Sequence, residues 1–163
     1  MGNNVSLEAT NKSIAIEEVK FESITTRFGA IQINKEKNIT FPLGILGIEG
    51  VRSYCLADYP ENKFPNFKVL QSLDDLNISF LVNPVTDFKI FDKKDLEECL
   101  NDLNIAQEEL AIVLITSIHK NVGEEKARIT VNMRAPIMID TKNYVAYQYV
   151  FKNDNYSLQH EIN

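Results

Sequence analysis

The chain is poor in the residues that build metal centres and disulfide frameworks. Its 163 residues include two cysteines, two histidines and no tryptophan. Cys55 and Cys99 belong to no C-x-x-C motif and have no third ligand nearby, which excludes the usual spacing of a zinc site. Two cysteines are also too few for the framework of a small secreted domain. We therefore expect reduced thiols, no metal and no cofactor.

Groups that carry out catalysis are also scarce. His119 ends an apolar segment and His160 lies near the C-terminus. No serine lies in a G-x-S-x-G motif, and the glycines of residues 44–50 match neither of the common phosphate-binding patterns. The sequence thus predicts no catalytic residue, although a triad assembled from distant residues leaves no motif.

Long apolar segments are absent as well. The longest, residues 110–118, falls well short of the roughly 18 residues that cross a bilayer, and residues 1–20 contain no signal-peptide core. The net charge of −6 argues against direct binding to nucleic acid or an anionic membrane, and it allows a basic partner. We expect a cytoplasmic protein that is monomeric on its own.

What the chain does contain is a series of short segments rich in β-branched and aromatic residues, separated by turn residues. Strands are predicted at residues 25–33, 39–41, 53–59, 67–72, 78–82, 110–119, 128–133, 137–139 and 144–151. One helix is predicted at about 92–103, where Asp92 can cap it and Leu96, Cys99, Leu100 and Leu103 form an apolar stripe. The predicted fold class is mostly β, a small antiparallel β-barrel-like fold with this short amphipathic helix packed outside.

The composition divides the chain into two parts. Residues 1–20 are rich in Asn, Ser, Glu and Lys and lack aromatics, which predicts a flexible N-terminal extension. Residues 21–163 are predicted to form a single domain, because a chain of this length can bury one substantial core.

A glycine-rich stretch at residues 41–54, F-P-L-G-I-L-G-I-E-G-V-R-S-Y, is unusually apolar for a loop. Either it folds back and plugs the core, or it offers an apolar surface to a partner, and the sequence leaves both interpretations open. The candidate partner contacts are Leu43, Ile45, Ile48 and Glu49, with Gly44 and Gly47 shaping the backbone.

Acidic residues are concentrated between residues 87 and 109, where eight acids accompany three lysines. The segment is either a solvated helix face or an electronegative surface that attracts a basic partner or repels RNA from one. Asp95, Glu98 and Asp102 are the candidate contacts on this face.

Five phrases occur in a distinctive order. They are the glycine-rich stretch, P-N-F at 65–67, L-Q-S at 70–72, F-L-V-N-P at 80–84 and N-M-R-A-P-I at 132–137. Together they resemble the flagellar assembly factor FliW family over about residues 22–160. Ile48 and Met133 replace the family's usual Phe and Leu and keep similar bulk. The N-terminal extension is not part of the pattern.

The resemblance implies a non-enzymatic, barrel-like regulatory protein. Members of the family bind cytoplasmic flagellin. When flagellin is exported, they bind the RNA-binding translational regulator CsrA at a site away from its RNA surface, so that flagellin translation is derepressed. Two other classes remain open from the residues alone: a small-ligand-binding or enzymatic β-barrel of unknown substrate, and a scaffold in a signalling complex.

Overall fold

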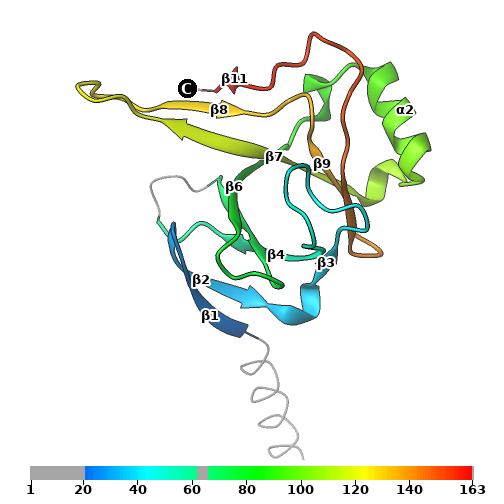
Figure 1. The fold of residues 1–163 in the computed structure, drawn as a ribbon. Helices are drawn as coiled ribbons and strands as arrows, with labels where there is room; N and C mark the ends of the chain where they lie inside the picture. Colours follow the sequence, from blue (N-terminus) through cyan, green and yellow to red (C-terminus); the bar gives the residue numbers. More distant parts are fainter. Residues whose placement is uncertain (1–20, 62–65, 163) are drawn as a thin grey trace, which may run out of the picture.

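The computed structural model describes residues 21–61 and 66–162, so the predicted flexible extension at 1–20 lies outside the described residues. These form eleven strands, one α-helix and three short 3-10 helices (Figure 1). The strands are β1 (Phe21–Thr26), β2 (Gly29–Asn34), β3 (Ile39–Thr40), β4 (Ser53–Asp58), β5 (Lys68–Ser72), β6 (Ser79–Pro84), β7 (Leu110–His119), β8 (Arg128–Val131), β9 (Ile137–Asp140), β10 (Val145–Gln148) and β11 (His160–Glu161). The helices are α2 (Lys93–Leu103), η1 (Lys35–Lys37), η2 (Phe88–Ile90) and η3 (Gln107–Glu109).

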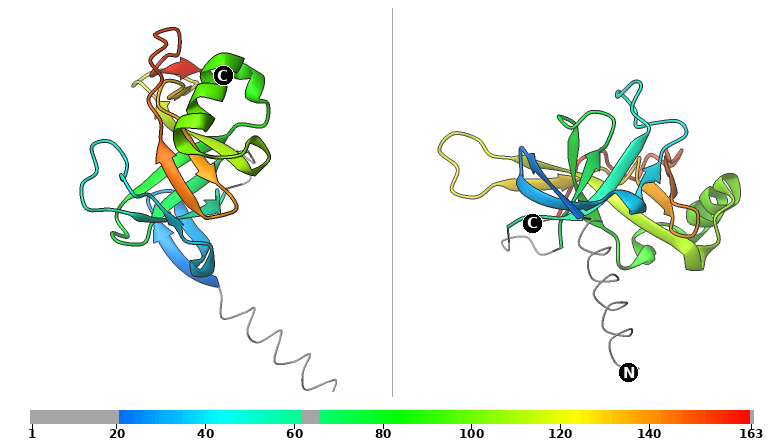
Figure 2. Two further views of the ribbon diagram at one scale, coloured as in Figure 1. Left: turned by 90° about the vertical axis from the view of Figure 1, so that its right-hand side faces the viewer. Right: turned by 90° about the horizontal axis from the view of Figure 1, so that it is seen from below.

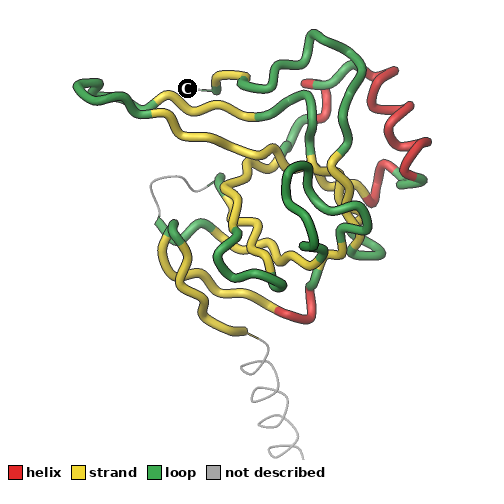
Figure 3. Tube along the Cα trace, in the orientation of Figure 1, coloured by secondary structure: helices red, strands yellow, loops and turns green. Residues whose placement is uncertain are grey.

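Seven strands close into a ring in the order β7, β6, β5, β4, β3, β10 and β9, and β9 pairs back onto β7 (Figure 3). The closure uses the first half of β7, where Leu110 faces Asp140 and Val113 faces Ile137. Every pair in the ring is antiparallel except β3 and β10, which are parallel. The predicted mostly β, barrel-like fold is therefore confirmed, with one parallel pair within it.

Residues 110–116 of β7 are buried on both faces because alternate side chains pack into two separate cores, whereas Ser117 and Ile118 are exposed. Val113 packs inside the ring with residues of β9 and β10. Ile112 and Leu114 point to the outer face, where they pack with buried residues of α2. The ring interior is filled by side chains; its buried members are Ile39, Phe41, Ile45, Val51, Tyr54, Leu70, Val82, Val113, Ile137, Ile139 and Ala146.

Helix α2 confirms the predicted helix and its cap. The Asp92 side chain accepts hydrogen bonds from the backbone N–H groups of Lys94 and Asp95, which satisfies donors that have no partner within the helix. Asn104 ends the helix in the left-handed conformation at φ 55°. The predicted apolar stripe is buried at Leu96, Cys99 and Leu100, so α2 packs on the outside of the ring.

Two further elements extend the ring. The second half of β7 pairs with β8, and β11 pairs with β8 at the edge of this extension. Figure 2 shows the β7–β8 hairpin projecting on one side of the molecule, with α2 on the opposite side. The β1–β2 hairpin lies over the outer face of β4 and β5, where Ile31 and Ile33 pack against Cys55 and Val69.

The single strand predicted at 25–33 is wrong, because this region belongs to the β1–β2 hairpin. The turn is stabilised locally: the Thr26 hydroxyl accepts a hydrogen bond from the Phe28 N–H and donates one to the Gly29 carbonyl. Gly29 adopts φ +115°, a conformation that few other residues tolerate. The intervening Arg27-Phe28 pair carries no turn signal, which explains the missed turn.

The long final strand predicted at 144–151 is also wrong, because β10 covers only Val145–Gln148. Beyond Gln148, the N–H groups of Tyr149 and Phe151 donate to the carbonyls of Pro136 and Arg134. Pro136 has no N–H with which to complete the ladder. The chain therefore continues alongside its neighbour without regular strand pairing.

Candidate functional site

The glycine loop, residues 41–52, consists of two tight turns in succession. The Gly44 N–H donates to the Phe41 carbonyl at 3.0 Å, and the Ile48 N–H donates to the Ile45 carbonyl at 3.0 Å. Gly47 adopts φ +84° at the third position of the second turn, as a type II turn requires. The loop is thus a defined structure whose turns project their central residues outward.

The side chains of the loop divide into two groups. Ile45 is 4% exposed and packs inside the ring with Phe41 and Val51. Leu43 is 81% exposed and Leu46 is 67% exposed. The loop therefore buries Phe41, Ile45 and Val51 in the ring interior and displays two leucines to solvent.

A hollow of about 580 Å³ opens within the loop. It is lined by Leu43, Ile45, Leu46, Gly47, Ile48, Glu49, Gly50 and Arg52. A methyl group added at Gly47 would meet no atom within 4 Å, so the backbone there is accessible. An apolar side chain of a partner could enter this hollow beside one acidic and one basic group.

Side chains from outside the loop hold its C-terminal end and its tip. Asp74 Oδ2 accepts hydrogen bonds from the backbone N–H groups of Arg52 and Ser53, at 2.7 and 2.9 Å. These two hydrogen bonds hold the pKa of the Asp74 carboxyl below its usual value, and the bond from the Arg52 N–H has the larger effect. At the tip, Gln148 Oε1 accepts a hydrogen bond from the Leu46 N–H at 2.9 Å.

The partner contacts predicted from the sequence differ in how far they are exposed to solvent. Leu43 and Glu49 are exposed, Ile48 is half-buried, and Ile45 belongs to the core. Gly44 leaves space for the Arg52 guanidinium, which donates to the Val51 carbonyl at 3.1 Å. Sequence reasoning missed Leu46, although its place in an apolar turn was a usable signal.

The acidic face of α2 is tied to the C-terminal segment. Asp95 Oδ2 accepts hydrogen bonds from Tyr156 Oη at 2.8 Å and Asn153 Nδ2 at 2.9 Å. Asp102 Oδ2 accepts one from Tyr149 Oη at 2.7 Å. Two of the three predicted acidic contacts thus also hold the fold together, while Glu98 is exposed on the same helix.

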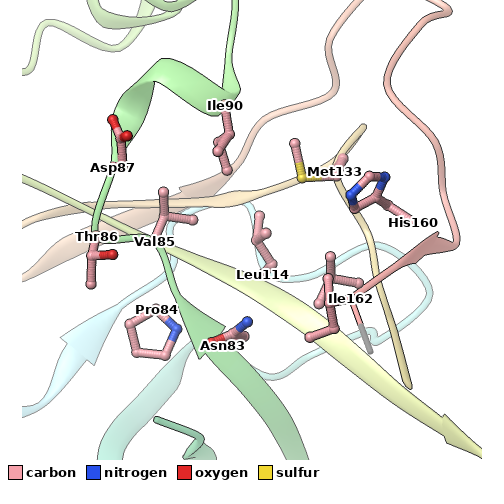
Figure 4. A pocket seen from close by; sticks show the side chains of 11 residues that line it. Asn83, Pro84, Val85, Thr86, Asp87, Ile90, Leu114, Met133, His160 and Ile162 are labelled. Carbon is pink, nitrogen blue, oxygen red and sulfur yellow. The ribbon is translucent and has the colours of Figure 1, made fainter. Parts of the chain in front are cut away.

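A second hollow, of about 480 Å³, lies on the outer face of the sheet (Figure 4). Leu114, Met133 and Ile162 give it an apolar lining, and Asp87 and His160 lie on opposite sides of it. No motif signals this hollow, because its lining residues come from separate segments of the chain.

Neither a metal centre nor a reactive thiol is found among residues 21–61 and 66–162. No cluster of three or more His, Cys, Asp or Glu side chains there could hold a metal. Burial raises the pKa of the Cys55 thiol and raises that of Cys99 to about 12, so both remain protonated and unreactive near neutral pH. In the same part of the chain, no helix has the length and apolarity needed to cross a membrane.

Known proteins resemble this chain over nearly the whole described region. The family model described as FliW protein matches residues 22–162. The flagellar assembly factor FliW of Clostridium tetani is 32% identical over 139 residues, covering 85% of this chain and 92% of the relative. That of Oceanobacillus iheyensis is 33% identical over 140 residues, covering 82% and 88%. That of Leptospira interrogans is 29% identical over 141 residues, covering 85% and 90%.

A solved structure supports the same fold. The crystal structure of a flagellar assembly factor FliW superposes with a TM-score of 0.64 at 24% identity, covering 86% of this chain and 96% of the other. The sequence relatives, the family model and the ring of strands agree with one another, and they confirm the family inferred from the five phrases. The chain belongs to the FliW family of flagellar assembly factors.

Proposed function

We propose that this protein is a flagellar assembly factor that acts by binding and not by catalysis. It binds flagellin in the cytoplasm. When free of flagellin, it binds a CsrA-type translational regulator and relieves the repression of flagellin translation. The match to the FliW family over residues 22–162 is the observation that carries this proposal.

The glycine loop is the proposed contact for flagellin. The central positions of tight turns usually hold polar residues or glycine, whereas here Leu43 and Leu46 occupy them and are largely exposed. Fully burying a leucine side chain contributes about 1.5–3 kcal/mol. Two leucines held on a braced loop could therefore provide the central apolar contact of an interface.

The acidic face of α2 is the proposed surface for action on CsrA. Glu97 and Glu98 are exposed on this helix, and their charges would repel RNA phosphates from a regulator bound nearby. Asp95 and Asp102 add to the same field, but their carboxylates also accept hydrogen bonds from tyrosines.

The functional proposal is tested with the full-length protein, purified flagellin and a purified CsrA-type regulator. We expect the protein to bind each partner at micromolar concentration and to release RNA from the regulator in a gel-shift assay. Added flagellin should restore RNA binding, because it removes the free antagonist. Absence of binding to both partners, together with a small molecule that raises the melting temperature, would instead favour a ligand-binding barrel.

The acidic-face proposal is tested by the salt dependence of antagonism. Neutralising Asp95, Glu98 and Asp102 together should weaken antagonism and flatten its dependence on salt, because screened charge repulsion is removed. Glu98→Gln alone should act in the same direction without touching the tyrosine hydrogen bonds. If the single variant keeps the full salt dependence while the triple variant loses stability, the acidic face acts only through the fold.

A further inference from the structure

We propose that Gln148 is a positioning residue that holds the glycine loop in the shape that presents Leu43 and Leu46. The inference rests on the proposed role of this loop in binding flagellin. Gln148 ends strand β10 and lies 102 residues from Leu46 in sequence. Neither the five phrases nor the loop's own composition points to it.

The amide of Gln148 connects the loop to the ring through both of its polar atoms. Its Oε1 accepts a hydrogen bond from the Leu46 N–H at 2.9 Å, and its Nε2 donates to the Ala135 carbonyl at 3.2 Å. Gln148 is half-buried and pairs with Ile137 of β9. The side chain is thus fixed at its base by the sheet and at its end by two backbone groups.

The tip of the loop depends on this connection. Asp74 holds the loop only where it enters β4, through the N–H groups of Arg52 and Ser53. In the second turn, the Ile45 side chain anchors one end and the Ile48 N–H bond closes the turn. The Leu46 N–H projects from the centre of that turn, and Gln148 is the group that receives it.

Loss of this hydrogen bond would affect binding through loop order. Gly44, Gly47 and Gly50 all adopt positive φ, and glycine loses more conformational freedom on ordering than other residues. A loop already ordered in the free protein does not pay this entropy on binding. Gln148 therefore acts on affinity without itself touching the partner.

The test uses full-length variants at Gln148 and a control. Gln148→Leu removes both hydrogen bonds and keeps a side chain of similar size. Gln148→Glu keeps an acceptor for the Leu46 N–H but loses the donor to the Ala135 carbonyl. Gln159→Leu makes the same apolar change at an exposed position in the C-terminal segment. Amide hydrogen exchange at Leu46 and Gly47 is measured by NMR, and flagellin affinity is measured by calorimetry.

We expect Gln148→Leu to speed exchange at Leu46 and to weaken flagellin binding, each by about tenfold, the equivalent of ordering roughly one residue. Gln148→Glu should recover part of both effects, and Gln159→Leu should change neither. Unchanged exchange in Gln148→Leu overturns the inference, as does faster exchange with unchanged affinity. If the wild-type protein does not bind flagellin, the proposed function fails, and the exchange rates alone still decide whether Gln148 holds the loop.

Discussion

Tyr54 places a hydroxyl group in the interior of the ring. Its side chain is 0% exposed, and its Oη has no hydrogen-bond partner among the described residues. The aromatic rings of Phe41 and Tyr54 meet edge to face, with their centroids 4.8 Å apart. This is a favourable geometry for two aromatic side chains. The aromatic ring of Tyr54 therefore contributes to packing, while its hydroxyl group carries an uncompensated desolvation cost.

Removal of this hydroxyl group should stabilise the protein. Tyr54→Phe keeps the aromatic contact and eliminates the unpaired polar atom, so we expect the free energy of unfolding to rise by about 1 kcal/mol. Urea denaturation measures this change, and Tyr144→Phe, at an exposed tyrosine, is the matched control. If Tyr54→Phe loses stability while Tyr144→Phe does not, the hydroxyl group of Tyr54 is hydrogen-bonded.

Asp95 makes the stability of the fold dependent on pH. Hydrogen bonds from Asn153 and then Tyr156 lower the pKa of the Asp95 carboxyl in the folded state. A group with a depressed folded-state pKa stabilises the protein above its unfolded pKa, about 3.9 for Asp, and this contribution is lost as pH falls through the folded pKa.

Asp95→Asn should therefore lower stability at pH 7 and flatten the loss of stability on acidification below about pH 4. Urea denaturation between pH 7 and pH 3 compares the variant with the wild type. Asp74 and Asp140 also have lowered pKa values, so part of the acid dependence should remain. Glu97→Gln removes a carboxylate from the exposed side of the same helix and serves as the control. If the free energy of unfolding of Asp95→Asn falls with acidification as steeply as that of the wild type, Asp95 is not a source of the acid dependence.

Among the structural elements, two of the three glycines in the glycine loop are under different constraints. Gly44 and Gly47 both adopt positive φ, at +68° and +84°. A Cβ at Gly44 would collide with Arg52 Nη1 and approach the Val51 carbonyl oxygen to 3.3 Å, whereas one at Gly47 would meet nothing within 4 Å. The backbone strain is common to both positions, and the collision is specific to Gly44.

Gly47→Ala should therefore cost about 1 kcal/mol of stability from backbone strain alone. Gly44→Ala should cost more, because the Arg52 guanidinium must also move away. Chemical denaturation measures both losses, and an Arg52→Ala background should remove most of the difference between them. Equal losses for the two substitutions in the wild-type background would contradict the expected difference and show that the guanidinium, at the flexible end of the Arg52 side chain, moves aside at little cost.

Elements with local signals could be predicted from the sequence. Helix α2 has a capping Asp92 and a helical apolar stripe, and the β5–β6 hairpin has Asp74 and Asp75 in its turn. The ends of elements were harder to predict where tertiary contacts decide them. Strand β10 stops at Gln148 because of Pro136 on its neighbour, and no local pattern in residues 144–151 shows this.

At the scale of the whole molecule, the relation of the loop to the ring could not be predicted. The sequence allowed the loop to be a plug or a partner surface. Ile45 faces the ring interior, as a plug requires, while Leu43 and Leu46 face solvent. Partner binding by these two leucines stays a prediction. The Gln148–Leu46 bond joins residues 102 positions apart, and only the closed ring brings them together.

We propose that the two exposed leucines of the glycine loop bind flagellin and that neither is needed to keep the ring folded. The most direct test is the flagellin affinity of Leu43→Ser/Leu46→Ser in the full-length protein, measured by calorimetry beside its melting temperature. Leu158→Ser, at a leucine 61% exposed in the C-terminal segment, is the matched control. We predict at least about a tenfold loss of affinity, since each buried leucine contributes about 1.5–3 kcal/mol, with little change in melting temperature and no loss in the control. Unchanged affinity in the double variant would contradict the claim.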